Sequence, residues 1–70
     1  MKYSAPMSGN VWKIMVKEGG TIDQGDVLII LESMKMEIPI EASQVGTVQK
    51  ILVGEGDFIQ EGDPVIDCTD

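Results

Sequence analysis

The sequence predicts an all-β domain in which two similar halves form two small sheets, packed on each other with quasi-two-fold symmetry. Three observations support this fold class: an internal repeat, many strand-forming Ile and Val residues without helical spacing, and glycine-containing turns at matching places in both halves. A half of this size cannot bury its own apolar face. Pairing the two halves covers both faces and gives the chain a single core.

The repeat extends over most of the chain. Residues 5–31 align without a gap on residues 42–68, an offset of 37, with 12 identities over 27 positions. Background amino-acid frequencies would give about two. The identical pairs are Ala5/Ala42, Gly9/Gly46, Val11/Val48, Lys13/Lys50, Ile14/Ile51, Val16/Val53, Glu18/Glu55, Gly19/Gly56, Ile22/Ile59, Gly25/Gly62, Asp26/Asp63 and Ile29/Ile66. We therefore expect one domain spanning residues 1–70.

The predicted strands follow the repeat. In the first half, alternate residues of a strand are expected to share one face. This face carries Val11 and Met15, with the polar Lys13 between them. This strand is expected at 10–16 and its counterpart at 47–53, with further strands at 27–31, 38–40 and 64–66. The arrangement places the termini together at one end and the middle of the chain at the other.

The predicted turns also come in pairs. Gly-rich segments are found at 18–20 and 54–57, and Asp/Gly turns at 23–26 and 60–63. In the second pair, Gly25 and Gly62 are expected to have positive φ, which glycine adopts without steric cost.

Composition excludes several functions. The net charge of −7, with five basic residues, disfavours binding to nucleic acid and to anionic membranes. There is no histidine, the commonest general base and metal ligand, and the Asp/Gly turns lack the oxygen spacing of a calcium loop. So short a chain also has no room for a substrate cleft. We expect no catalytic site, no metal site, no nucleic acid and no membrane partner.

The single cysteine, Cys68, permits no intrachain disulfide, and we expect it to be a half-buried apolar side chain. This fits a reducing, cytoplasmic setting. No apolar run reaches membrane-spanning length, and the first residues lack the apolar stretch of a signal peptide.

The middle of the chain is the candidate functional segment. Residues 32–37 read Glu-Ser-Met-Lys-Met-Glu and lie between two predicted strands, so a hairpin turn is expected at 33–36. The turn contains no Gly, Asn or Asp, the residues that tight hairpins normally use. Such a disagreement between sequence and local structure is typical of functional sites. In the plain alternative, Met34 and Met36 fold back into the core and Lys35 is merely solvated.

A lysine at a hairpin tip suits one chemistry well. The deprotonated ε-amine on its flexible stem attacks an activated carboxyl and forms an amide. A rigid β frame would then hold the root of a long arm while a cofactor at its end reaches other active sites. The residues thus predict covalent attachment of a carboxyl-bearing prosthetic group to Lys35.

Three features together resemble a known family: residues 5–9 (Ala-Pro-Met-Ser-Gly), residues 32–37, and the duplicated Gly/Asp turns. They are similar to biotinyl domains of biotin-dependent carboxylases, including biotin carboxyl carrier proteins and small biotin/lipoyl attachment proteins. The resemblance covers about residues 4–68. It implies a flattened β-barrel, also called a barrel-sandwich hybrid or hammerhead, of two four-stranded sheets. The modified lysine lies on the hairpin between the halves.

The resemblance also implies partners and residue roles. Biotin protein ligase would attach biotin to Lys35, with Met34 and Met36 helping to position the lysine and Glu32 as the family's acidic residue three positions earlier. A biotin carboxylase would carboxylate the biotin on its ureido nitrogen. A carboxyltransferase would then pass the CO2 to an acceptor.

Two alternatives remain open. The ungapped repeat leaves no room for the "thumb" insertion of some acetyl-CoA carboxylase carrier proteins, and this brings the chain nearer to lipoyl domains. Those domains usually have Asp-Lys-Ala at the tip, and a lipoyl ligase would modify the same Lys35 for a 2-oxo-acid dehydrogenase or glycine-cleavage system. The second alternative is an unmodified interaction domain, as in membrane-fusion adaptor proteins.

Overall fold

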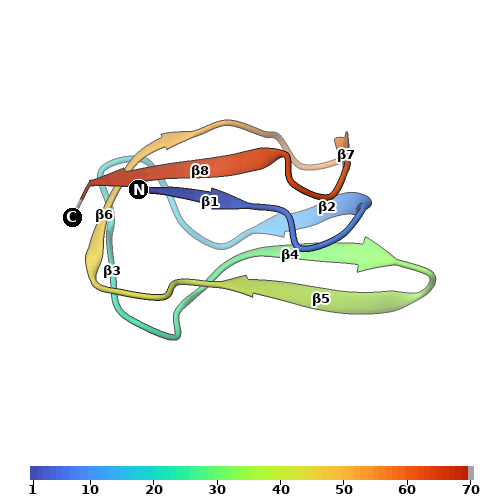
Figure 1. Cartoon of the computed structure of the whole chain (residues 1–70), viewed down its shortest axis with the longest axis horizontal. Coiled ribbons are helices and arrows are strands. Elements are labelled where there is room, and N and C mark those ends of the chain that lie inside the picture. The colour runs from blue at the N-terminus through green and yellow to red at the C-terminus, as the bar shows by residue number, and fades with distance from the viewer. Residues whose placement is uncertain (70) are drawn as a thin grey trace.

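The chain, of which the computed structural model describes residues 1–69, folds into two four-stranded antiparallel sheets (Figure 1). The strands are β1 (Lys2–Ser4), β2 (Gly9–Ile14), β3 (Thr21–Ile22), β4 (Val27–Ser33), β5 (Met36–Glu41), β6 (Gly46–Ile51), β7 (Phe58–Ile59) and β8 (Pro64–Thr69). One sheet has the order β1-β8-β6-β3 and the other the order β5-β4-β2-β7. The predicted all-β fold is confirmed. No helix of the described chain is long and apolar enough to cross a membrane.

The core follows the predicted two-fold symmetry. The buried apolar residues fall into pairs separated by 37 positions: Tyr3/Ile40, Ala5/Ala42, Val11/Val48, Ile22/Ile59, Leu28/Val65, Ile29/Ile66 and Leu31/Cys68. Each half therefore contributes the same positions to one shared core. Only some of these pairs are identical residues, so the symmetry of the packing is more complete than the symmetry of the sequence.

Hydrogen bonds also cross between the halves in equivalent pairs. Glu18 Oε2 accepts a bond from the Ile51 amide at 3.0 Å, and Glu55 Oε2 accepts one from the Ile14 amide at 3.0 Å. Each carboxylate satisfies a backbone donor of the other half, at the point where a long strand ends. The two halves are therefore interlocked rather than merely stacked.

The glycine turns use the same kind of exchange. The Gly25 amide donates to the Ala42 carbonyl at 2.8 Å, and the Gly62 amide donates to the Ala5 carbonyl at 2.9 Å. Their φ values are +91° and +90°. The predicted positive φ at both glycines is confirmed.

The alternation predicted in the first long strand is wrong beyond Val11. A β-bulge between Val11 and Lys13 inserts one extra residue, so Ile14 rather than Met15 packs against the core and Met15 is 54% exposed. The strand itself ends at Ile14 rather than at residue 16. The second half repeats the bulge between Val48 and Lys50.

The two ends of the molecule differ as predicted. At one end β1 pairs with β8, and the Met1 ammonium group donates to the Cys68 carbonyl at 2.6 Å. The β4–β5 hairpin lies at the opposite end (Figure 1). Cys68 is 4% exposed, so it is fully buried rather than half-buried as expected.

Candidate functional site

The β4–β5 hairpin ends in a two-residue loop. The strands pair from Val27 and Glu41 to Ser33 and Met36, which leaves only residues 34 and 35 in the turn. Met34 has φ +52° and Lys35 has φ +66°. Two successive left-handed residues are the signature of a type I′ turn, whose twist matches that of the flanking strands. The turn predicted at 33–36 is confirmed.

This turn is built from residues that do not favour it. A side-chain-bearing residue in the left-handed region costs on the order of 1 kcal/mol relative to ordinary backbone. Hairpins of this type normally place Asn, Asp or Gly at both positions. Here the long β4–β5 ladder holds Met34 and Lys35 in the turn against that cost. The fold alone therefore gives no reason for these two residues.

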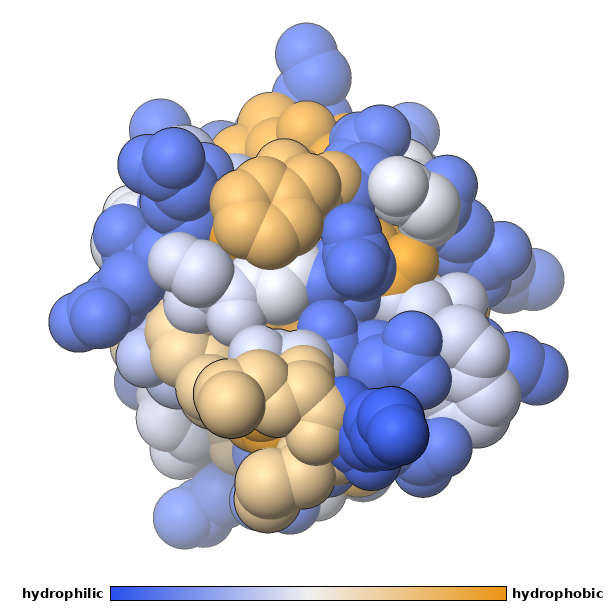
Figure 2. All heavy atoms as spheres, turned by 90° about the vertical axis from the view of Figure 1, so that its right-hand side faces the viewer, coloured by the Kyte–Doolittle hydropathy of each residue, from blue (hydrophilic) through white to orange (hydrophobic). Residues whose placement is uncertain are grey.

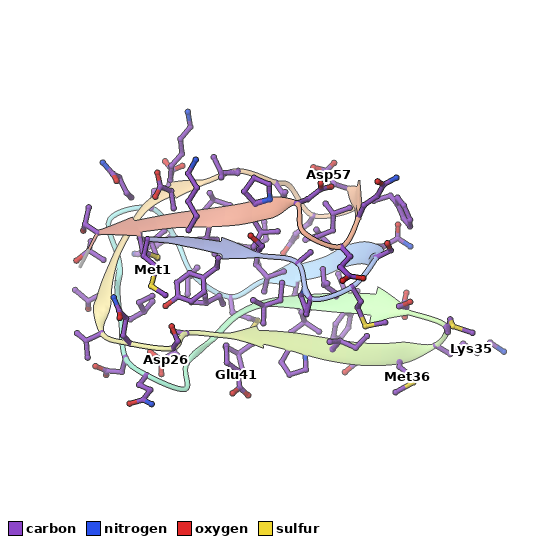
Figure 3. All side chains as sticks on the ribbon, viewed as in Figure 1. Met1, Asp26, Lys35, Met36, Glu41 and Asp57 are labelled. Carbon is purple, nitrogen blue, oxygen red and sulfur yellow. The ribbon has the colours of Figure 1, made fainter. Side chains whose placement is uncertain are left out.

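The tip side chains project into solvent. Met34 is 90% exposed and Met36 is 63% exposed, so the alternative in which they fold back into the core is wrong. Lys35 is also exposed, and within residues 1–69 no group forms a hydrogen bond or ion pair with its side chain. Figure 3 shows Lys35 and Met36 at the extreme end of the molecule, far from Met1.

The base of the hairpin, unlike its exposed tip, is buried and paired with a neighbouring strand. Leu31 is fully buried, and Glu32, three residues before the lysine, pairs with Asn10 of β2. Gly9 allows β2 to approach closely, because a Cβ at that position would lie 2.8 Å from the Glu32 carbonyl oxygen and 3.3 Å from Ser33 Cβ. The Glu32 side chain is exposed on the outer face of the sheet. The hairpin thus presents an exposed side chain from a base that is buried and paired within the sheet.

This geometry fits a covalently attached group. The side chain of Lys35 is exposed, no side chain among residues 1–69 forms a hydrogen bond or ion pair with its amine, and the flanking methionines offer apolar contact. An amide bond to a carboxyl-bearing cofactor requires an amine of this kind. In the part of the chain that the structure describes, no group of three His, Cys, Asp or Glu residues could hold a metal ion.

Asn10 and Phe58, which the sequence does not single out as functional residues, lie beside the hairpin. The register pairs Glu32 with Asn10 and Asn10 with Phe58, so these residues lie side by side on β4, β2 and β7. Phe58 is 64% exposed. One signal was available in the sequence, because the repeat aligns Phe58 with Thr21. The pairing of β2 with β7 joins distant segments and could not be derived from that signal alone.

Comparison with known proteins places this geometry in a family. A family model described as "Biotin-requiring enzyme", the biotin/lipoyl attachment domain, matches residues 2–67. The "Biotin/lipoyl attachment protein" of Bacillus subtilis is 54% identical over 44 residues, which cover 63% of this chain and 60% of that protein. The "Biotinylated protein TB7.3" of Mycobacterium tuberculosis is 53% identical over 38 residues, 54% of each chain. A "Putative urea carboxylase" of Emericella nidulans is 53% identical over 38 residues, only 3% of its length.

Solved structures show the same fold. The urea carboxylase of Kluyveromyces lactis matches with a TM-score of 0.88 and 35% identity, over 94% of this chain and 6% of that one. The lipoyl domain of the 2-oxoglutarate dehydrogenase complex of Azotobacter vinelandii matches with a TM-score of 0.84 over 100% of this chain and 96% of that one. At 21% identity, the second match bears on the fold alone.

Proposed function

Because the chain belongs to the biotin/lipoyl attachment domain family, whose members are non-catalytic carriers, we propose that it is a biotin carboxyl carrier with biotin attached to Lys35. We also propose that residues 1–70 act as one carrier domain. Biotinylated or carboxylase proteins are prominent among its relatives. The matched segments span 60% of the Bacillus subtilis attachment protein and 3% of the Emericella nidulans urea carboxylase.

One observation carries the proposal: an accessible lysine stands at the tip of a strained turn, between two exposed methionines. The attachment step forms a C–N bond between Lys35 Nζ and the activated carboxyl of biotin. The activating group leaves with its bonding electrons, and the amine gives up a proton. Met34 and Met36 provide apolar contacts on both sides of the amine, and we assign them to recognition by biotin protein ligase, together with Glu32.

The frame then determines how the domain works as a carrier. Biotin, when bound, accepts a carboxyl group at one enzyme site and donates it at another. The protein holds the base of the arm through the buried Leu31 and the β4–β5 ladder, while the side chain of Lys35 is exposed to solvent. Tethering keeps the group at high effective concentration near both partners, a biotin carboxylase and a carboxyltransferase.

Lipoate on the same lysine is the second candidate. The name of the Bacillus subtilis relative includes both cofactors, and both are attached through a carboxyl group to a lysine amine. A lipoyl ligase would then replace the biotin ligase as partner. The exposed methionines favour biotin, because lipoyl domains usually have Asp and Ala at these two positions.

Intact mass spectrometry tests the choice. The protein would be purified from cells that co-express a biotin ligase and a lipoyl ligase and supplied with both acids. We expect a biotinyl mass increment. A lipoyl increment would replace the proposed function with the second candidate, and no increment would leave an unmodified interaction domain.

A further inference from the structure

The outer face of the hairpin sheet carries a straight row of exposed side chains behind Lys35. The cross-strand pairs Glu37–Glu32, Glu32–Asn10 and Asn10–Phe58 place one residue from each of β5, β4, β2 and β7 side by side. Directly opposed residues in antiparallel strands point to the same face, and all four are exposed. We call Glu37, Glu32, Asn10 and Phe58 the outer row.

The other end of the molecule has the equivalent row with different residues. The two-fold relation that aligns positions 37 apart matches Glu32 with Thr69, Asn10 with Thr47 and Phe58 with Thr21. These threonines pair in the same way, Thr21 with Thr47 and Thr47 with Thr69. We call Thr21, Thr47 and Thr69 the threonine row.

The threonine row consists of residues that strands favour. Threonine is enriched in strands, whereas Asn and, to a lesser degree, Glu are depleted there. Glu32 and Glu37 are directly opposed like charges, an arrangement that destabilises a sheet. Within residues 1–69 neither carboxylate has an ion-pair partner. Phe58 adds a 64% exposed aromatic ring on a two-residue edge strand. The outer row is therefore not explained by folding.

We propose that the outer row is a docking surface for the ligase that modifies Lys35, with Phe58 as its apolar anchor. This inference rests on the proposed function. The complementary ligase surface has an apolar pocket for Phe58, a hydrogen-bonding group for Asn10, and basic side chains facing Glu32 and Glu37. Aromatic anchors surrounded by polar contacts are the usual source of binding energy in such interfaces.

The position of the outer row supports this occupant. Glu32 lies three residues before Lys35 and Glu37 two residues after it, so the row begins at the base of the modified tip. Four adjacent strands span about 14 Å, whereas a standard protein interface covers roughly 800 Å² on each partner. A ligase that encloses Lys35 over an ordinary area will therefore also cover the row. Figure 2, which faces the hairpin end, shows apolar patches among strongly hydrophilic side chains.

Docking on the row explains how one lysine is selected. The chain contains five lysines, and a Met-Lys-Met segment alone offers little surface for discrimination. A row fixed in the sheet defines both the position and the direction of Lys35 relative to the ligase. The two carboxylates add attraction for a basic surface, which accelerates encounter and weakens as salt is added.

The test exchanges side chains between the outer row and the threonine row. The variant Asn10→Thr/Glu32→Thr/Phe58→Thr gives the hairpin end the threonine row. The matched control Thr21→Phe/Thr47→Asn/Thr69→Glu places the same three side chains at the end without Lys35. Purified unmodified proteins are incubated with biotin protein ligase, biotin and ATP, and kcat/KM is measured by intact mass at low and high salt.

We expect kcat/KM for the outer-row variant to fall at least about tenfold, mainly through KM, with an undiminished melting temperature. The salt dependence should weaken as well. The control should stay within about twofold of the wild-type kcat/KM. If the triple variant does not fold, Phe58→Thr alone serves, because its exposed ring contributes little to the core.

Modification of the outer-row variant at the wild-type rate would overturn the inference while leaving the proposed function intact. An equal loss in the control would also overturn it, because the effect would then not be specific to the hairpin end. Absence of modification in the wild-type protein would instead overturn the proposed function, and this inference with it.

Discussion

The glycine turns and the hairpin tip both pass through left-handed backbone, but they use different residues to do so. Gly19, Gly25, Gly56 and Gly62 have φ values between +87° and +93°. At the tip, Met34 and Lys35 adopt φ +52° and +66° with full side chains. The turns between the other strands use glycine, the residue for which left-handed backbone costs least. The tip keeps side chains that the turn does not favour.

The difference separates positions whose residues the fold explains from positions whose residues it does not explain. The glycines occur as two symmetry-related pairs, one member in each half. The tip has no such counterpart, because the matching place lies between β8 and β1, the strands that carry the termini. The duplicated frame could therefore change at this one place without disturbing its symmetric core.

The largest expected effect concerns the reactive group itself. Lys35→Arg should abolish modification completely, because a guanidinium is not a usable nucleophile at neutral pH. The melting temperature should stay unchanged, because the Lys35 side chain has no partner to lose among the described residues 1–69. Intact mass and thermal denaturation by circular dichroism measure both. Residual modification of this variant would point to Lys13, Lys50 or another lysine instead.

The methionines should show the next largest effect. Met34→Asp/Met36→Ala should lower the ratio of biotinylation to lipoylation by about tenfold or more, because the apolar contacts beside Lys35 are replaced by a charge and a small group. Competition between the two ligases, followed by mass spectrometry, gives the ratio. Unchanged biotin incorporation would contradict the role assigned to both methionines.

The frame glycines should respond in stability rather than in modification. Gly25→Ala and Gly62→Ala should each destabilise the fold by about 1 kcal/mol, since an added Cβ meets nothing within 4 Å and the cost is that of the backbone alone. Urea denaturation measures the loss. The two values should agree because the sites are symmetry-related. A large difference between them would break the equivalence of the two halves.

The smallest effect is expected at the tip and has the opposite sign. Met34→Asn should stabilise the fold by about 0.5 kcal/mol, because Asn tolerates the left-handed backbone of this turn better than Met. The rate of biotinylation should fall at the same time. Urea denaturation and a ligase assay on the same sample compare the two. A less stable variant would show that the turn is not under strain.

The sequence alone predicts most features of the glycine turns and the position of the hairpin tip. The offset of 37 predicted the symmetric halves, the paired positive-φ glycines and the position of the hairpin. These features depend on local turn chemistry and on a repeat that can be read directly along the chain.

Other features depend on pairings that a single strand does not reveal. The bulges after Val11 and Val48 shift the faces of two strands, and alternation of residues alone cannot show an inserted residue. The alignment of Phe58 with Asn10 arises from a two-residue strand that pairs across the repeat boundary. Such short edge strands have too few residues to form a recognisable pattern.

Locating the modified lysine tests the role of the hairpin tip most directly. The wild-type domain would be modified by biotin protein ligase with biotin and ATP, digested, and mapped by tandem mass spectrometry. We predict a single biotinyl group on Lys35 and none on Lys2, Lys13, Lys17 or Lys50. Modification of any other lysine in preference to Lys35 would contradict the central claim that the strained tip exists to present this amine.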